Sequence, residues 1–176
     1  VGTGATYTLT QSEVGKTITV EASYTDAHGT SETVNSAATA AVTNVNDAPT
    51  GLVTIDNTTP AEGDTLTASN TLADEDGLGA NTYIWKADGA TLGAGATDTL
   101  TQAVVCKAIS VEASYTDGQG TSETVSSAAS ATVTNVNDAP TGSLTIDNTT
   151  PAEGDTLTAA NTLADEDGLG AITYTW

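Results

Sequence analysis

Residues 107–117 read KAISVEASYTD, and apolar and polar side chains alternate along them. Every second residue from Ile109 to Tyr115 is apolar, and polar residues stand between. A period of two places the apolar residues on one face of an extended chain, which is the pattern of a half-buried β-strand. This stretch predicts a strand whose inward side chains are Ile109, Val111, Ala113 and Tyr115 and whose outward side chains are Ser110, Glu112 and Ser114.

The same pattern occurs a second time, because the sequence repeats itself with a period of 91 residues. Its counterpart is KTITVEASYTD at 16–26, and in the register that aligns Val1 with Leu92, 67 of 85 positions are identical. The segment VTNVNDAPT at 42–50 returns unchanged at 133–141. A long, near-exact repeat is typical of an array of one structural unit, whose reach and number of contacts grow with copy number.

The rest of one repeat also predicts short strands separated by turns. Residues 73–81 form an acidic, glycine-rich loop, and Asp88-Gly89 is a turn of the hairpin kind. No segment has the 3.6-residue apolar period of a helix over ten residues, which excludes a helical solenoid. About seven short strands per 91-residue repeat predict an all-β fold, a β-sandwich. The strands are expected at 51–56, 65–70, 82–86, 97–101, 107–117 and 121–136.

The sequence Asn-Asp-Ala-Pro is expected to mark the joint between repeats. The chain then has three parts: 1–46 is the C-terminal part of a repeat, 47–137 is a complete repeat, and 138–176 is the N-terminal part of the next. The two partial repeats together lack only the counterparts of 86–91. Three arrangements remain open: the parts complement each other between neighbouring chains, the chain is a stretch of a continuous filament, or the structural unit is permuted relative to the usual sandwich.

The charge balance is strongly acidic. The chain has 23 Asp and Glu residues against three Lys and Arg residues, a net charge of −20. Phosphate binding needs clustered cations, so nucleic acid is excluded as a partner, and an anionic membrane surface is disfavoured. No stretch approaches the roughly 18 apolar residues of a membrane helix, so no membrane insertion is expected. The acidic excess is explained either by a solubilising surface or by carboxylates that bound cations neutralise.

Nothing in the sequence predicts catalysis. The single cysteine, Cys106, aligns with Gly15 in the other repeat, and the single histidine, His28, aligns with Gln119. One cysteine excludes a disulfide within the chain. A catalytic role for Cys106 or His28 would exist in only one of two nearly identical repeats, and the carboxylate pairs have no histidine to polarise them. We therefore expect a protein that is not an enzyme.

Trp85 stands in the third predicted strand, and Ser12–Lys16 precedes a strand in the manner of the corner before the sixth strand of immunoglobulin-like domains. Together with NVNDAPTG, TLADEDGLG and YIW, these features closely resemble the tandem cadherin-like or immunoglobulin-like (Ig-like) repeats of giant bacterial surface proteins, including adhesins of the RTX and biofilm-associated kinds. The resemblance covers essentially all 176 residues. It implies Ig-like/cadherin-like β-sandwich repeats in tandem. In the absence of a disulfide, Leu66, Val111 and Tyr115 would fill the space around Trp85.

The resemblance implies a non-enzymatic structural repeat, extracellular or at the bacterial cell surface, that forms a stalk or filament for adhesion or biofilm cohesion. Its partners would be neighbouring copies of the same repeat, joined head to tail with strand complementation, and also surface glycans or other cells. The alternative is a glycan-binding β-sandwich module of a secreted protein. That alternative needs exposed aromatic side chains, whereas Tyr83, Trp85 and Tyr115 are predicted on core faces.

In cadherins, calcium lies between consecutive domains and is bound by a linker of the form D-x-N-D-x-P, a Glu near the first turn and a D-x-D loop of the next domain. This chain has residues that match each of these segments, so the resemblance implies Ca²⁺ at the joints. Calcium takes six to eight oxygen ligands. The implied ligands are Glu62, Asn135, Asn137, Asp138, Asp165 and Asp167 at one joint and Asn44, Asn46, Asp47, Asp74 and Asp76 in the copy.

Two other interpretations of the acidic segments remain open. The same sequences form metal-free turns in which Asp and Asn side chains bind backbone amides. Alternatively, ions lie within a domain, near Asp117 and Glu123. The chain also departs from the cadherin pattern. The first linker position is Asn135 rather than Asp, which removes a charge and should weaken affinity, and Val104 replaces the corner carboxylate Glu13 of the other repeat.

Overall fold

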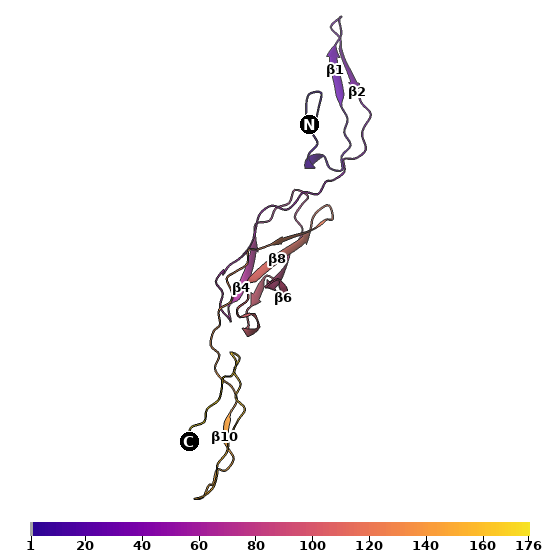
Figure 1. Ribbon diagram of the computed structural model, residues 1–176. Coiled ribbons are helices and arrows are strands. Elements are labelled where there is room, and N and C mark those ends of the chain that lie inside the picture. The colour runs from indigo at the N-terminus through magenta and orange to yellow at the C-terminus, as the bar shows by residue number, and fades with distance from the viewer. Residues whose placement is uncertain (1) are drawn as a thin grey trace. The chain divides into compact units, whose positions relative to one another are not determined.

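The computed structural model describes residues 2–176, and its regular structure is all-β, as predicted (Figure 1). The helical elements of these residues are two single 3-10 turns, η1 (Gln11–Glu13) and η2 (Gln102–Val104). No helix within the described range is long and apolar enough to span a bilayer. The strands are β1 (Glu21–Thr25), β2 (Ser31–Asn35), β3 (Val53–Ile55), β4 (Thr65–Asn70), β5 (Thr82–Ala87), β6 (Ala90–Ala94), β7 (Thr97–Thr99), β8 (Ile109–Thr116), β9 (Ser122–Ser126), β10 (Leu144–Ile146) and β11 (Ala159–Asn161).

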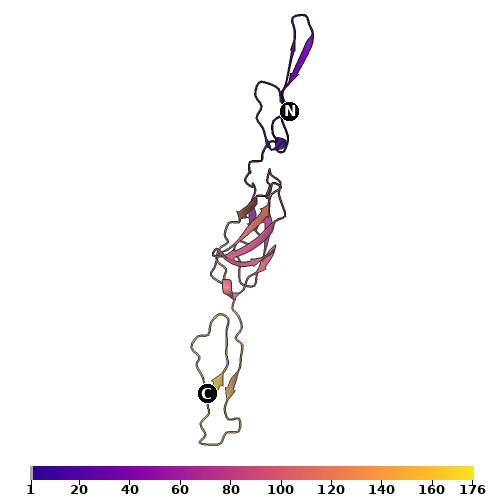
Figure 2. The same ribbon diagram turned by 90° about the vertical axis from the view of Figure 1, so that its right-hand side faces the viewer.

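Strands β3 to β9 form two sheets within the predicted complete repeat (Figure 1, Figure 2). One sheet has the order β3-β4-β7, and the other has the order β6-β5-β8-β9. The pairs β3–β4, β4–β7 and β5–β6 are antiparallel. Two small sheets with apolar inner faces are consistent with a β-sandwich.

The core of these sheets contains the side chains that the sequence predicts. Burial alternates along β8, so that its apolar residues from Ile109 to Tyr115 face inward. Trp85 and Leu66 are completely buried. The indole nitrogen of Trp85 donates a hydrogen bond to the Gly95 carbonyl at 3.0 Å, which satisfies the one polar atom of this side chain. The predicted burial of Trp85, Leu66, Val111 and Tyr115 is confirmed.

The Asp88-Gly89 turn joins β5 to β6, a strand that the sequence analysis missed. Ala87 pairs with Ala90, and the two residues between them have positive φ values of 48° and 83°. A two-residue turn with positive φ at both positions is the type that matches the twist of a hairpin. β6 was missed because Ala90–Ala94 is largely exposed and has no run of alternating large apolar residues.

The last predicted strand, 121–136, is regular only in β9. Beyond it, Ser127 N donates to Val111 O and Ser130 N to Ile109 O, both at 2.8 Å, so this segment advances three residues for every two of β8. Because the segment advances by three residues where β8 advances by two, no backbone carbonyl of the segment accepts from the amides of Val111 and Ile109. The hydroxyl oxygens of Ser127 and Ser130 replace them and accept from Val111 N and Ile109 N, both at 3.0 Å. We call these four hydrogen bonds the hydroxyl ladder.

The first partial repeat has the same ladder. The hydroxyl oxygens of Ser36 and Thr39 accept from the amides of Val20 and Ile18, both at 3.0 Å. Ser36 N and Thr39 N donate in return to the carbonyls of the same two residues, at 2.9 Å. A Ser or Thr at both positions therefore supports the same irregular pairing in each copy.

The described chain divides into two compact units. The first holds the residues up to Gly51 together with Thr71–Asn81 and Ser114–Val125, and the second holds Leu52–Asn70, Thr82–Ala113 and Ser126–Trp176. These limits differ from the predicted boundaries at 46/47 and 137/138, because the acidic loop 71–81 and the end of β8 lie with the preceding linker. The predicted domains stay a prediction.

Candidate metal centre

Glu62 lies beside the segment Asn135–Asp138, which we call the second linker. The chain that leaves the complete repeat pairs in parallel with the turn carrying Glu62: Thr134 N donates to Pro60 O at 3.0 Å, and Glu62 N donates to Thr134 O at 2.9 Å. As a result, the amide of Val136 lies 3.4 Å from Glu62 Oε2. Backbone pairing therefore places this carboxylate at the start of the linker.

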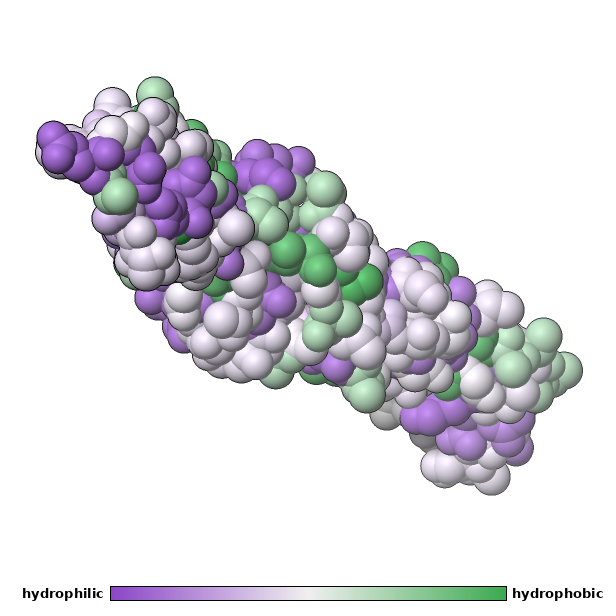
Figure 3. Space-filling model, turned by 90° about the horizontal axis from the view of Figure 1, so that it is seen from below, coloured by the Kyte–Doolittle hydropathy of each residue, from purple (hydrophilic) through white to green (hydrophobic). Residues whose placement is uncertain are grey.

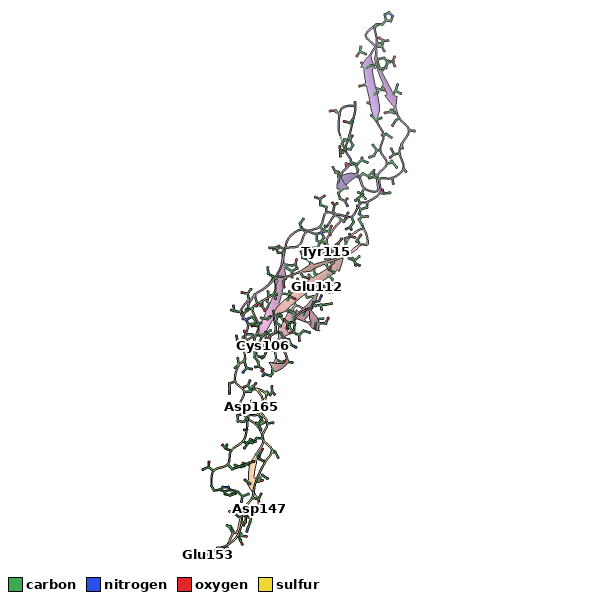
Figure 4. The ribbon with its side chains drawn as sticks, viewed as in Figure 1. Cys106, Glu112, Tyr115, Asp147, Glu153 and Asp165 are labelled. Carbon is green, nitrogen blue, oxygen red and sulfur yellow. The ribbon has the colours of Figure 1, made fainter. Side chains whose placement is uncertain are left out.

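The acidic loop of the last partial repeat is attached to the same linker. Thr141 and Ala164 exchange two backbone hydrogen bonds of 2.8 and 3.0 Å. Asp138 N donates to Asp167 Oδ2 at 2.8 Å, and Asp167 N donates to Asp165 Oδ1 at 3.0 Å. Asp167 thus attaches the loop to the linker, and Asp165 (Figure 4) accepts a hydrogen bond within the loop itself.

Three carboxylates converge where these segments meet. One oxygen from each of Glu62, Asp138 and Glu166 lies within 4.8 Å of the others. Glu62 and Asp138 are partly buried, and Asp138 Oδ2 is buried with no hydrogen-bond partner. Two like charges about 4 Å apart repel by about 1 kcal/mol in water and about 4 kcal/mol in a protein surface environment. A cation would remove this repulsion and supply the partner that Asp138 Oδ2 lacks.

The side-chain amide of Gln102 closes the cluster from the side of η2. With its nitrogen turned inward, it donates to Glu62 Oε2 at 2.7 Å and to Asn135 Oδ1 at 3.0 Å. In the opposite orientation the nitrogen donates to Asp167 Oδ1 at 3.4 Å, and the amide oxygen faces Glu62. Rotation of one amide therefore exchanges a hydrogen-bond donor for an oxygen ligand at this point.

The donor set fits calcium. Carboxylates of Glu62, Asp138 and Glu166, together with the amide oxygens of Asn135 and Gln102, are all hard oxygen ligands of the kind that calcium takes. This group of five contains no imidazole or thiolate, the ligands typical of structural zinc. The unpartnered Asp138 oxygen and the all-oxygen composition of the group both favour a hard divalent cation.

The first linker, Asn44–Asp47, has the same attachment to its acidic loop. Asp47 N donates to Asp76 Oδ2 at 2.7 Å, and Gln11 Nε2 donates to Asp76 Oδ1 at 2.6 Å. Both oxygens of the buried Asp76 therefore accept hydrogen bonds from the protein. Asn44 Oδ1 is buried without a hydrogen-bond partner. The residues that correspond to Gln102, Asn135, Asp138 and Glu166 are Gln11, Asn44, Asp47 and Glu75, whereas Glu62 has its counterpart in Glu153 of the last partial repeat.

Asp74 holds the acidic loop to the end of β8. Its Oδ2 accepts from the hydroxyl of Tyr115 (labelled in Figure 4) at 2.5 Å. Its Oδ1 accepts from Asp76 N at 2.8 Å. Burial raises the pKa of Tyr115, and the hydrogen bond to the Asp74 carboxylate raises it further. Asp74 is thus engaged by protein donors on both oxygens.

Asp117 and Glu123, the other predicted ion position, are engaged in turns and contacts. Asp117 Oδ1 accepts from Gln119 N at 2.9 Å and from Thr121 N at 2.8 Å, while Oδ2 is buried without a partner. Burial alone would raise the pKa of Asp117, but the backbone hydrogen bonds outweigh it and lower the pKa. Glu123 Oε1 accepts from Asn46 Nδ2 at 2.7 Å. An ion at this position stays a prediction.

The structure thus separates the predicted ligands into two groups. Glu62, Asp138 and Asn135 come together, whereas the Asp pairs of both acidic loops accept hydrogen bonds from the protein. Asn46 and Asn137 turn their amide nitrogens towards protein oxygens. Sequence reasoning missed Glu166, which stands between the two predicted Asp ligands, and Gln102. The signal for Gln102 was its identity with Gln11 in the repeat register.

Comparisons with known proteins leave the family open. No protein-family model matches the chain, and a search of curated proteins found no match. The function is therefore inferred from the repeated sequence and from the geometry of the linkers.

Proposed function

We propose that the chain is part of an extracellular, non-enzymatic structural repeat of a bacterial surface protein, a stalk or filament module for adhesion or biofilm cohesion. Calcium at the linkers makes the repeat array rigid. The observation that carries this proposal is the convergence of the carboxylates of Glu62, Asp138 and Glu166, of which Asp138 has a buried oxygen without a hydrogen-bond partner. These residues come from a complete repeat, its linker and the following part, so one cation would couple successive repeats.

The strand order supports an Ig-like unit. The first, second and fifth strands of the complete repeat share one sheet, and the third, sixth and seventh share the other. This is the grouping of Ig-like sandwiches, with the fourth strand on the side of the third. The third strand carries the buried Trp85, as the resemblance implies. Such modules in tandem act by length and repetition, which fits a stalk.

The ligands of the ion would come from three directions. Glu62 would bind from the first turn, Asp138 from the linker and Glu166 from the acidic loop, while the amide oxygens of Asn135 and Gln102 complete the set. Calcium supplies positive charge and directed coordination to oxygens. Without a cation, the three carboxylates repel one another and the linker is stiffened mainly by Pro140. The acidic residues at the joints therefore favour an extended array only when a cation is bound.

The burial of the aromatic residues supports the stalk over a glycan-binding module. Trp85 is completely buried, and Tyr115 is buried with its hydroxyl bonded to Asp74. The hydroxyl of Tyr83 accepts from Asn70 Nδ2. Two of the three aromatic side chains of the complete repeat are thus buried and Tyr83 is half-buried, which disfavours the exposed aromatic platform that the glycan-binding alternative needs.

Calorimetric titration of the chain with Ca²⁺ and with Mg²⁺ tests the metal centre. We expect calcium to bind, and Glu62→Gln and Asp138→Asn each to weaken binding by about tenfold or more, which corresponds to about 1.4 kcal/mol. Glu32→Gln removes the same charge from an exposed residue of β2 and should leave the affinity unchanged. Absence of calcium uptake, or equal affinity in all three variants, would contradict the proposal.

A further inference from the structure

The two orientations of the Gln102 amide make hydrogen bonds on different sides of the second linker. With the nitrogen inward, Nε2 donates to the two Glu62 oxygens, at 2.7 and 3.1 Å, and to Asn135 Oδ1 at 3.0 Å. With the nitrogen outward, Nε2 donates to Asp167 Oδ1 at 3.4 Å. Gln102 and Glu62 precede the linker in the chain, and Asp167 follows it. The outward orientation therefore adds a hydrogen bond across the linker.

The backbone of Gln102 is fixed, so that its amide can turn alone. The flanking residues Leu100 and Val104 are buried, and Val104 N donates to Thr101 O at 3.0 Å, which closes the turn η2. A half-turn about the last side-chain torsion exchanges the amide oxygen and nitrogen and leaves the other atoms in place. A change of orientation therefore needs no movement of η2.

The outward contact also occurs at the first linker. Gln11 Nε2 donates to Asp76 Oδ1 at 2.6 Å, across the same separation of 65 residues that lies between Gln102 and Asp167. In both copies the other oxygen of the loop aspartate accepts from the amide of the linker aspartate, at 2.7 and 2.8 Å. We call the loop aspartate with these two donors the carboxylate bridge. Its occurrence in both copies shows that the turn and the loop accommodate an outward amide.

The charge at the cluster determines which orientation is favoured. Without a cation, an inward amide oxygen would lie 2.7 Å from Glu62 Oε2, and two acceptors at this distance repel each other. An inward nitrogen instead donates to the carboxylate, and such charge-assisted hydrogen bonds are strong. A cation at the cluster reverses the preference, because it attracts the amide oxygen and repels the N–H hydrogens.

The surface of the chain favours the arrival of cations. Hydrophilic residues, shown in purple, gather at several places on the face in Figure 3. The chain carries a net charge of −20, and a field of this sign raises the local concentration of counter-ions. A cation that reaches the cluster then competes with the inward N–H group for the oxygens of Glu62 and Asn135.

We propose that Gln102 is a calcium-dependent switch of the second linker. In the calcium-free chain its amide nitrogen donates to Glu62 and Asn135, and the carboxylate bridge lacks its glutamine. With calcium bound, the amide turns its oxygen inward and its nitrogen to Asp167, which completes the bridge. Ion binding thus adds a contact across the linker besides the ligands themselves. This inference rests on the calcium centre proposed above and names the residue that transmits ion binding to the acidic loop.

Through-space NMR contacts of the Gln102 amide protons test the switch directly. We expect contacts with the Glu62 side chain in the calcium-free chain and contacts with Asp167 in the calcium-saturated chain. The signals are assigned by their loss in Gln102→Ala. If the amide protons keep the same contacts in both states of a chain that binds calcium, the switch is wrong.

A double-mutant cycle on the calcium affinity tests the contact with Asp167. A hydrogen bond that exists with and without the ion cancels from the affinity, so only one that forms on binding gives a non-additive effect. We expect Gln102→Ala and Asp167→Asn each to weaken binding. Their combination should weaken it about fivefold less than the product of the two single effects. Asn at position 167 retains one oxygen to accept from Asp138 N.

The matched control for charge is Glu32→Gln, at an exposed residue of β2, and its effect should be additive with that of Gln102→Ala. Calorimetry separates failure of the switch from failure of the proposed function. Calcium uptake with additive effects of Gln102→Ala and Asp167→Asn would overturn the switch and leave the metal centre in place. Absence of calcium uptake would overturn both.

Discussion

Trp85 and Trp176 occupy the same position of the repeat and have opposite environments. Truncating the buried Trp85 to Ala should cost about 3–5 kcal/mol, the usual cost for a buried aromatic residue, and should abolish cooperative unfolding of so small a domain. Thermal unfolding followed by circular dichroism at low protein concentration measures the effect. Trp176→Ala makes the same chemical change at an exposed site and should leave the Tm unchanged; equal shifts in both variants would show that Trp85 is not a core residue.

Glu13 in η1 is held by its neighbours in the ionised form. Ser12 Oγ donates to Glu13 Oε1 at 2.7 Å, and the amide and hydroxyl of Thr10 both donate to Oε2 at 2.9 Å. These hydrogen bonds lower the pKa of Glu13 from 4.5 to about 2. Because the folded pKa is depressed, the stabilisation of this turn is present above pH 4.5 and is lost as the pH falls through about 2.

An NMR titration of the Glu13 carboxyl carbon measures this pKa. The midpoint should lie close to 2 in the native chain, and Ser12→Ala should move it upward because the hydrogen bond that lowers this pKa most is removed. A midpoint in the ordinary range for glutamate would show that the turn does not hold the carboxylate as described.

At the scale of elements, the hydroxyl ladder determines how the last segment of the repeat follows β8. Removing the hydroxyl of Ser127 or Ser130 leaves the amide of Val111 or Ile109 without an acceptor inside the protein. Each Ser→Ala change should therefore cost about 1–3 kcal/mol, the penalty for an unsatisfied buried polar group. Urea unfolding measures this cost. Ser126→Ala, at an exposed position of β9, is the matched control and should be nearly neutral.

The ladder also predicts which substitution is tolerated. The first partial repeat has Thr39 where the complete repeat has Ser130, and its hydroxyl makes the same hydrogen bond. Ser130→Thr should therefore retain most of the stability that Ser130→Ala loses. If the free energy of unfolding falls equally in Ser130→Thr and Ser130→Ala, then packing rather than the hydroxyl group explains why a serine is needed at position 130.

At the scale of the whole molecule, removing calcium should loosen the linkers and leave the individual sandwiches folded. The carboxylates of the candidate centre lie between repeats, while the core residues lie within them. Small-angle scattering of a chain of several repeats, with calcium and with a chelator, measures the change. We expect a smaller and broader distribution of dimensions in chelator with unchanged strand content. Identical profiles in both conditions would exclude a mechanical role for the ion.

The sequence by itself determined the local structure of this protein. Alternation in residues 107–117 predicted β8 and its inward side chains, because a strand has a period of two whatever surrounds it. The Asp88-Gly89 pair predicted a hairpin, because few other residues adopt positive φ at both positions. The exposed strand β6 and the irregular end of the last segment escaped prediction, since neither has an apolar period.

Only the tertiary structure decided which polar residues meet. Glu166 and Gln102 join Glu62 because backbone pairing at the linker brings a turn, η2 and an acidic loop together. The spacing of these residues in the sequence does not predict that their side chains lie close in space. Burial was decided in the same way. The residues that precede Trp85 and Trp176 are nearly identical, yet Trp85 is buried and Trp176 is exposed, because burial depends on contacts with other strands and not on the local sequence.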